Sequence, residues 1–235
     1  MVAVLPFESP LRPGSRLDAK TSPAGSSIVI VQPHPIMRDG LVRTVSTLVP
    51  GAQVNGYPSI SALLGQVPDG HFNLVITELN LRLPECSLSS LEQLRRRLPL
   101  VEILTLSPLS ERQFGLPALR GGATAFLSLS VSLEELGEAI QALLAGAGYI
   151  STEMAAVVAD EAQGRGPRNG FSKLSPRELD VIRHLIWGMQ LKTVASTLGL
   201  NIRTASCYKK NALGKLGMSS VAEVVRYSSE QGLTV

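Results

Sequence analysis

The chain has 235 residues, of which 44% are hydrophobic and 4% aromatic, a length that suggests one or two domains. It holds no apolar run of about 18 residues, and its first residues lack a basic segment followed by a long apolar core. We therefore expect neither a transmembrane helix nor a secretory signal, and a cytoplasmic location.

The net charge of +3 is unevenly distributed along the chain. From Gly170 onward nine Lys and Arg residues stand against four acids, a net charge of +5, which leaves −2 for the preceding part. A small basic domain attached to a slightly acidic one is typical of a DNA-binding protein with a separate regulatory domain. On charge alone, ordinary scatter of surface charge remains the alternative.

Residues 1–26 hold four prolines and no apolar period, so we expect a disordered tail. From residue 27 to 146, strand-like and helix-like segments alternate. The β-branched run Ile28-Val-Ile-Val31 is typical of a strand buried on both faces. Further strands are expected at 74–77, 101–106 and 125–127, and helices at 36–48, 89–98 and 132–144. This alternation predicts an α/β fold, a doubly wound (flavodoxin-like) parallel sheet with helices on both faces.

Residues 147–170 are expected to form a linker, because glycine and proline gather between residues 160 and 170. An all-α domain of four helices is predicted over 171–235. Its first helix begins at Ser175-Pro-Arg-Glu178, the pattern of a capping box with proline at the first helical position, and runs to about Trp187. Further helices are expected over 192–198, over 201–216 and from residue 219 or 220 onward.

The segment Asn201–Leu216 is expected to be a recognition helix that enters the major groove of DNA. Ala205, Leu213 and Leu216 would face inward. Lysine ammonium groups contact phosphates or guanine edges, and short side chains allow close approach to base edges. The outward candidates for DNA binding are Arg203, Ser206, Cys207, Lys209, Lys210 and Lys215. On pattern alone, a helical protein-interaction bundle with a solvated lysine face remains the alternative.

A family resemblance covers roughly 54 residues of this domain. The segments that carry it are Leu174-Ser-Pro-Arg-Glu-Leu179, Gly188-Met-Gln-Leu-Lys-Thr-Val-Ala195, Thr204-Ala-Ser206 and Lys215-Leu-Gly217, and they resemble the LuxR-type helix-turn-helix. The resemblance implies that the recognition helix starts at Thr204 and that Lys192 lies near the DNA backbone. It also implies a final helix, here Ser220–Ser228, that forms a dimer contact on DNA. The run Ser-Cys-Tyr-Lys-Lys is most similar to the RcsB and BvgA members.

Residues 27–146 resemble the receiver domain of NarL/FixJ-type response regulators. His34–Arg38 is similar to the segment after the receiver's first strand, and Gly122–Leu127 to the run before the fifth-strand lysine. The resemblance implies a phosphorylation site with two acids for a divalent metal, a phosphoaccepting aspartate, a Ser or Thr, and a lysine. A hard cation prefers oxygen ligands and neutralises the phosphoryl group, and the lysine pairs with the phosphate.

At these positions the chain has Gln32, Pro33, Glu78, Ser107 and Leu129. Proline offers no side-chain ligand and leucine cannot pair with phosphate, so only Ser107 retains the required chemistry. We therefore expect a degenerate receiver that neither binds Mg²⁺ for catalysis nor is phosphorylated at Glu78. Glu78 has two interpretations, a built-in phosphate mimic reaching toward Ser107, or drift in a domain retained for dimerisation.

Other constellations point to no enzyme. Cys86 and Cys207 fall in different domains without metal-like or redox-like neighbours, so we expect two reduced thiols. The histidines are scattered, no nucleophile motif is present, and no glycine-rich phosphate loop occurs. The sequence predicts no catalytic residue, no metal site and no cofactor.

Together these patterns predict a transcriptional regulator that binds double-stranded promoter DNA, as a homodimer or with another response regulator, independently of receiver phosphorylation. The alternative is a co-regulator or antagonist that heterodimerises with another response regulator and contributes little DNA binding alone. Conventional activation by phosphorylation requires the acids that this sequence lacks.

Overall fold

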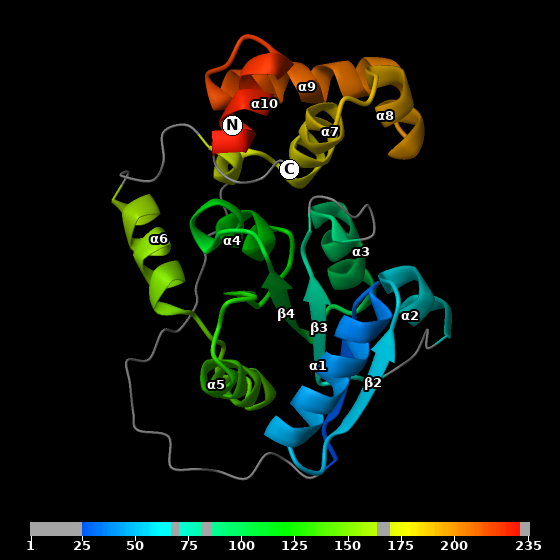
Figure 1. Ribbon diagram of the computed structural model, residues 1–235, viewed down its shortest axis with the longest axis vertical. Helices are drawn as coiled ribbons and strands as arrows, with labels where there is room; N and C mark the ends of the chain where they lie inside the picture. Colours follow the sequence, from blue (N-terminus) through cyan, green and yellow to red (C-terminus); the bar gives the residue numbers. More distant parts are fainter. Residues whose placement is uncertain (1–24, 67–70, 81–85, 164–169, 231–235) are drawn as a thin grey trace.

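The computed structural model describes residues 25–66, 71–80, 86–163 and 170–230 (Figure 1). Residues 1–24 of the predicted tail and 164–169 of the predicted linker lie outside the described residues. A parallel sheet of order β2-β1-β3-β4-β5 is followed by a helical domain, which confirms the predicted fold class. The strands are β1 (Ser27–Val31), β2 (Gln53–Tyr57), β3 (Leu74–Glu78), β4 (Glu102–Ser107) and β5 (Ala125–Ser128). The helices that cover the sheet are α1 (Pro35–Leu48), α2 (Ile60–Gln66), α3 (Leu88–Arg97), α4 (Glu111–Arg120) and α5 (Leu133–Leu144).

Helices cover both faces of the sheet because successive side chains of each buried strand point to opposite faces. Ile28 and Ile30 of β1 belong to the apolar cluster that α1 and α5 complete. Val29 and Val31 belong to the other cluster, which includes side chains of α2, α3 and α4. The parallel register brings the carboxyl ends of β1, β3, β4 and β5 to one edge, where the receiver positions predicted from sequence gather.

Helix α6 (Thr152–Ala162) lies inside the segment that was predicted to be a linker. The side chain of Ser151 caps it by accepting a hydrogen bond from the Met154 backbone N–H at 3.0 Å, and donates one to Glu111 of α4. Met154 is 1% exposed and packs against α4. A Cβ atom at Gly115 would lie 2.1 Å from Met154 Sδ, so a larger residue at position 115 would displace the buried Met154 side chain.

The helical domain packs directly on α3 and α4 of the sheet domain. Phe171, in a short 3₁₀ helix (Phe171–Lys173), is fully buried and stacks on Phe114 of α4 with ring centroids 5.7 Å apart. Its ring also lies 5.5 Å from that of Tyr227 in the last helix. Such aromatic pairs stabilise beyond the area they bury. A single apolar cluster therefore continues from the sheet through α4 into the helical domain.

Candidate nucleic-acid interface

The helical domain consists of α7 (Pro176–Ile186), α8 (Leu191–Thr197), α9 (Ile202–Leu216) and α10 (Val221–Glu230). The predicted capping box is present at the start of α7: Ser175 Oγ accepts from the Glu178 N–H, and Glu178 Oε2 accepts from the Ser175 N–H. Helix α9 begins after Asn201, whose side-chain oxygen accepts from the Arg203 N–H at 2.9 Å. It ends at Gly217, whose φ of 68° is left-handed. The helix predicted over 201–216 is therefore present, with Asn201 as its cap.

One side of α9 is apolar and packs against α7 and α8. Ala205, Ala212 and Leu216 are at most 1% exposed, and Leu213 is half-buried. The inward positions predicted from sequence are thus confirmed, and they fix which side of α9 faces away from the domain.

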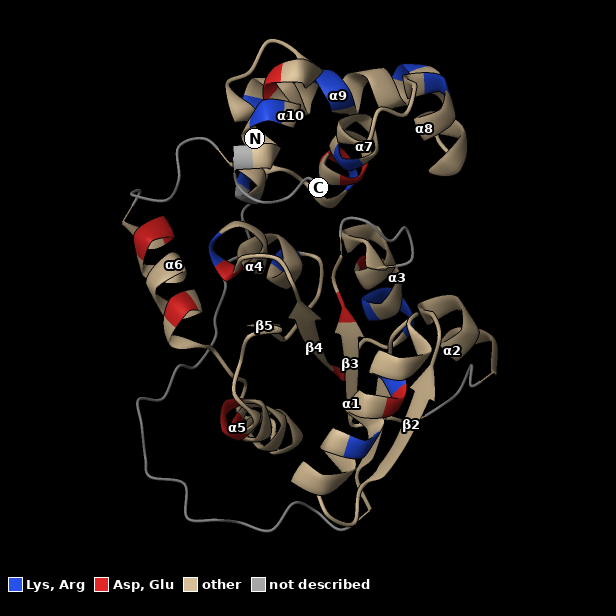
Figure 2. Ribbon diagram, viewed as in Figure 1, with Lys and Arg blue, Asp and Glu red and all other residues tan. Residues whose placement is uncertain are grey.

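The other side of α9 carries most of the predicted DNA contacts. Arg203, Thr204, Ser206, Cys207 and Lys210 are exposed, and Lys209 is half-buried. Lys192, near the start of α8, is exposed as well. Figure 2 shows Lys and Arg on α8, α9 and α10, with α7 between α9 and the sheet domain. The packed sheet domain therefore leaves these side chains accessible.

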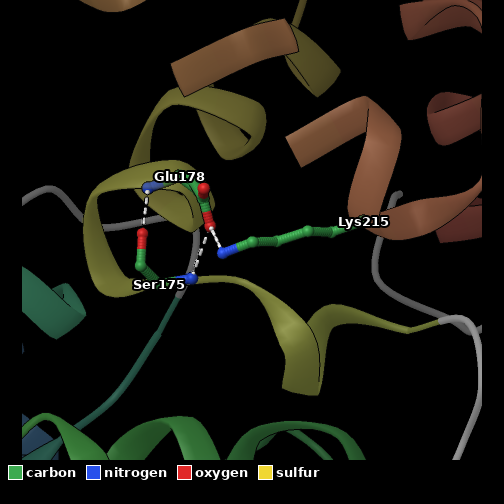
Figure 3. Close-up of polar contacts among 3 residues, drawn as sticks. All are labelled: Ser175, Glu178 and Lys215. Carbon is green, nitrogen blue, oxygen red and sulfur yellow. Dashed lines mark hydrogen bonds and ion pairs between the residues drawn. The ribbon is translucent and has the colours of Figure 1, made fainter. Parts of the chain in front are cut away.

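Lys215 differs from the other candidates because its ammonium group is held within the domain. Its Nζ lies 2.7 Å from Oε2 of Glu178, the same oxygen that accepts from the Ser175 N–H (Figure 3). The Glu178 side chain is 5% exposed and that of Lys215 is 44% exposed. The pair joins the last turn of α9 to the first turn of α7, so Lys215 is placed to orient α9. Its predicted role as a DNA contact stays untested.

Three buried polar residues of α7 were not singled out in the sequence. Arg183 and Asp180 are 1% exposed and His184 is 2% exposed. His184 Nδ1 lies 2.7 Å from the Asp180 carbonyl oxygen and donates to it, while Nε2 lies 3.4 Å from Arg183 Nη2. The Arg183 guanidinium also lies 5.7 Å from the centre of the Trp187 ring. Burial lowers the pKa of His184 and raises the pKa of Asp180.

The positions expected from the sequence to form a degenerate phosphoacceptor site lie at the carboxyl edge of the sheet. Glu78 ends β3 and is 7% exposed; its Oε2 accepts from Gln32 Nε2 at 2.7 Å and its Oε1 accepts from Asn80 Nδ2 at 2.7 Å. Ser107 Oγ donates to the Leu79 carbonyl at 2.6 Å. Glu78 therefore bonds two amides, and the contact with Ser107 that the mimic interpretation requires is not formed between these described residues.

These residues do not fit the divalent metal of a working receiver. Gln32 directs its amide N–H toward Glu78, Pro33 has no side-chain ligand, and the Leu129 side chain is apolar and 39% exposed. Among the described residues no group of three or more His, Cys, Asp and Glu is placed to hold a metal ion. A hard cation needs several oxygen ligands, and Gln32, Pro33 and Leu129 contribute no carboxylate beside Glu78. None of the helices within residues 25–66, 71–80, 86–163 and 170–230 combines the length and the apolar character that a membrane span requires.

Comparisons with known proteins agree with the two-domain architecture. Residues 172–228 match the family described as bacterial regulatory proteins, luxR family. The chain is 32% identical over 209 residues to the transcriptional activator protein ExaE of Pseudomonas putida, covering 88% of this chain and 97% of that protein. It is 30% identical to the nitrate/nitrite response regulator protein NarP of Escherichia coli, covering 87% and 95%.

Among solved structures, RcsB of Salmonella enterica bound to the promoter rprA has a similar fold. The TM-score is 0.69 at 22% identity, and the match covers 87% of this chain and 98% of RcsB. The helix-turn-helix match and the full-length relatives, together with the sheet order and the exposed α9, lead to one assignment. The chain belongs to the LuxR-type response regulators and is a DNA-binding transcriptional regulator.

Proposed function

We propose that this regulator binds promoter DNA in the cytoplasm as a dimer, without phosphorylation of its receiver domain. The observation that carries the proposal is the exposed face of α9 in a molecule whose two domains are packed together. With the two domains packed in this way, the receiver does not have to move for α9, the proposed recognition helix, to be exposed.

The DNA contacts follow from that face. Ser206, Cys207 and Lys210 would meet base edges and phosphates in the major groove, with Arg203, Thr204 and Lys209 beside them. Lys192 would contact the backbone from α8. Lys215 would act as a positioning residue, because its ammonium group already bonds Glu178.

Independence from phosphorylation is supported by the receiver edge. Both oxygens of Glu78 accept hydrogen bonds from amides, and among the described residues Glu78 belongs to no group of three or more His, Cys, Asp and Glu placed to hold a metal ion. A phosphoryl transfer that is catalysed by positioning and by metal charge lacks both aids here. The receiver would instead serve as the surface on which the DNA-binding domain docks.

The dimeric state is proposed from the relatives. A solved structure of similar fold is described as two RcsB dimers bound to two parallel DNAs. In this chain α10 would supply the dimer contact on DNA, over the segment 220–228. Two copies would then read two half-sites whose spacing reflects the two-fold symmetry.

The test uses the purified full chain and an operator selected from a random DNA pool. Lys210→Met should weaken binding and reduce the slope of log K against log salt by about 0.9, because one phosphate contact is lost. Arg43→Met, which removes an exposed cation from α1, is the matched control and should change neither quantity. If the full chain selects no sequence, the alternative of a heterodimerising co-regulator is favoured.

A further inference from the structure

The ring of Phe171 links the receiver domain to the last helix of the DNA-binding domain. It stacks on Phe114 of α4 with a centroid distance of 5.7 Å and an angle of 19° between the ring planes. It also lies 5.5 Å from the Tyr227 ring of α10, at an angle of 42°. Both separations fall within the roughly 4.5–7 Å at which aromatic rings attract one another. Two ring contacts therefore connect α4 with α10.

Burial makes this link stiff. Phe114 and Phe171 are 0% exposed, and the short helix Phe171–Lys173 packs against both α4 and α9. Val224 of α10 belongs to the same apolar cluster as these two rings. Closely packed interiors deform little and transmit strain, so the position of α4 bears on Tyr227. The placement of α10 therefore depends on a side chain that the receiver holds.

The start of α10 is held by hydrogen bonds within its own segment. Glu223 accepts from the Ser219 N–H at 2.9 Å, and the Glu223 N–H donates to Ser220 Oγ at 3.3 Å. Tyr227 lies one turn further along the helix and contacts Phe171 instead. Local bonds thus fix where α10 begins, whereas the contact with Phe171 helps to fix its direction.

The opposite face of α10 is exposed. Ala222, Arg226 and Ser229 recur on it at helical spacing, whereas Val224 on the inner face is fully buried. The exposed face overlaps the segment 220–228 that we propose as the dimer contact. A two-fold contact brings the same face of two copies together, so a change in the direction of α10 displaces both sides of the contact.

We propose that Phe171 is a positioning residue for dimeric DNA binding: held by Phe114 of the receiver, its ring seats Tyr227 and thereby sets the direction of α10. This inference rests on the proposed dimer contact at α10. It gives the unphosphorylated receiver a part in DNA binding beyond that of a docking surface, because the receiver orients the helix through which two copies meet. Since Phe171 is fully buried, it acts on DNA binding through α10 and not by touching DNA.

Hydrogen exchange in the full chain without DNA tests the link from the receiver to α10. Phe114→Leu alters the receiver alone, yet the amides of residues 224–229 should exchange about two- to tenfold faster, the factor expected for the loss of one aromatic pair. Phe171→Leu should accelerate exchange at least as much. In a Phe171→Leu background, Phe114→Leu should add nothing, because the ring that joins the two sides is already absent.

Phe126→Leu is the matched control for Phe114→Leu. The Phe126 side chain is 1% exposed and lies in β5, inside the sheet domain. Its truncation should lower the free energy of unfolding, as loss of a buried ring does, but leave exchange in α10 unchanged. The comparison separates a specific link to α10 from a general loss of stability in the receiver.

Binding to DNA with one or two half-sites tests the consequence for the dimer. The dissociation constant of Phe171→Leu for a single half-site should stay within about twofold of that of the unmodified chain, because the reading face of α9 is unchanged. Cooperative binding to two half-sites should weaken about tenfold, or about threefold for each copy whose α10 is less often in place. Tyr227→Leu removes the same ring contact from the side of α10 and should separate the two DNAs in the same way.

Exchange in α10 that Phe114→Leu leaves unchanged would overturn the proposal, as would equal acceleration by Phe126→Leu. A half-site affinity that falls as far as the two-site affinity would also overturn it, because α9 would then be displaced as well. If the unmodified chain binds two half-sites without cooperativity, the proposed dimer fails; faster exchange in Phe114→Leu would still support the link from the receiver to α10.

Discussion

Replacing Lys215 with methionine separates a lysine that orients α9 from lysines that contact DNA. The substitution keeps the length of the side chain and removes the partner of Glu178, whose side chain is 5% exposed. Glu178 Oε2 would retain only the Ser175 N–H as a donor. Removing one partner of a fully buried pair costs about 3–5 kcal/mol. Because the Lys215 side chain is 44% exposed, solvent screens the pair, and we expect a loss of about 1–2 kcal/mol.

Two assays read the result. Urea unfolding should show a lower midpoint at unchanged slope. In a double-mutant cycle, Lys215→Met should cost much less in a Glu178→Gln background, because the carboxylate that needs the ammonium is absent. In DNA binding, Lys215→Met should leave the salt slope unchanged, whereas Lys210→Met should reduce it by about 0.9.

Lys215 does not orient α9 if Lys215→Met unfolds in urea like the unmodified chain and its salt slope is reduced as far as that of Lys210→Met. Lys215 would then leave Glu178 and contact a phosphate when DNA is bound.

Two further predictions concern packing and pH. Gly115→Ala should lower the free energy of unfolding in urea by about 1–3 kcal/mol, because the new Cβ atom meets the buried Met154 side chain. Gly40→Ala in α1 is the control: a Cβ atom there has open space, so the free energy of unfolding should rise by up to about 1 kcal/mol. Equal effects of the two substitutions would contradict the contact between residue 115 and Met154. Burial lowers the pKa of His184 in the folded chain, so as the pH falls the unfolded chain takes up the imidazole proton at a higher pH than the folded chain does. The free energy of unfolding should therefore decrease as the pH drops below about 6.5, at no more than about 1.4 kcal/mol per pH unit. His184→Asn retains a donor for the Asp180 carbonyl and should flatten that part of the profile; a profile parallel to that of the unmodified chain would exclude His184 as its source.

The sequence predicted those helices and strands whose residue types favour the secondary structure that they form. The run Ile28–Val31 is β-branched throughout and lies in β1, an interior strand of the sheet. The capping box at Ser175 and the glycine at 217 mark helix ends by local hydrogen bonding and backbone conformation, which a single sequence displays. The recognition helix was predictable for the same reason.

The sequence did not predict helix α4 or strand β2, whose residue types do not favour the secondary structure that they form. Helix α4 contains Gly115 and Pro117, which disfavour helix interiors, yet Phe114 and Ala118 are buried and hold it against the sheet. Strand β2 lies at the sheet edge and is half exposed, so it lacks the apolar run of the central strands. Tertiary packing overrides local preference in both cases.

Long-range contacts explain the remainder of the site. Lys215 looks like its neighbouring lysines in the sequence, and only the fold brings it to Glu178, 37 residues away. A polar pocket lined by side chains of both α3 and α7 likewise depends on the fold, because neither segment alone indicates it. In contrast, the expectation that Gln32 and Pro33 stand at the positions of the receiver's acids depends on residue type and needs no fold.

The central claim is that the receiver does not control DNA binding through phosphorylation. The most direct measurement is the dissociation constant of the full chain for its selected operator, before and after incubation with Mg²⁺ and a small phosphodonor at fixed salt. If DNA binding is independent of phosphorylation, the two dissociation constants should agree within about twofold, well below the roughly 5–150-fold effect of a typical allosteric coupling. Affinity at least about tenfold tighter after incubation, accompanied by stoichiometric incorporation of phosphate, would contradict it.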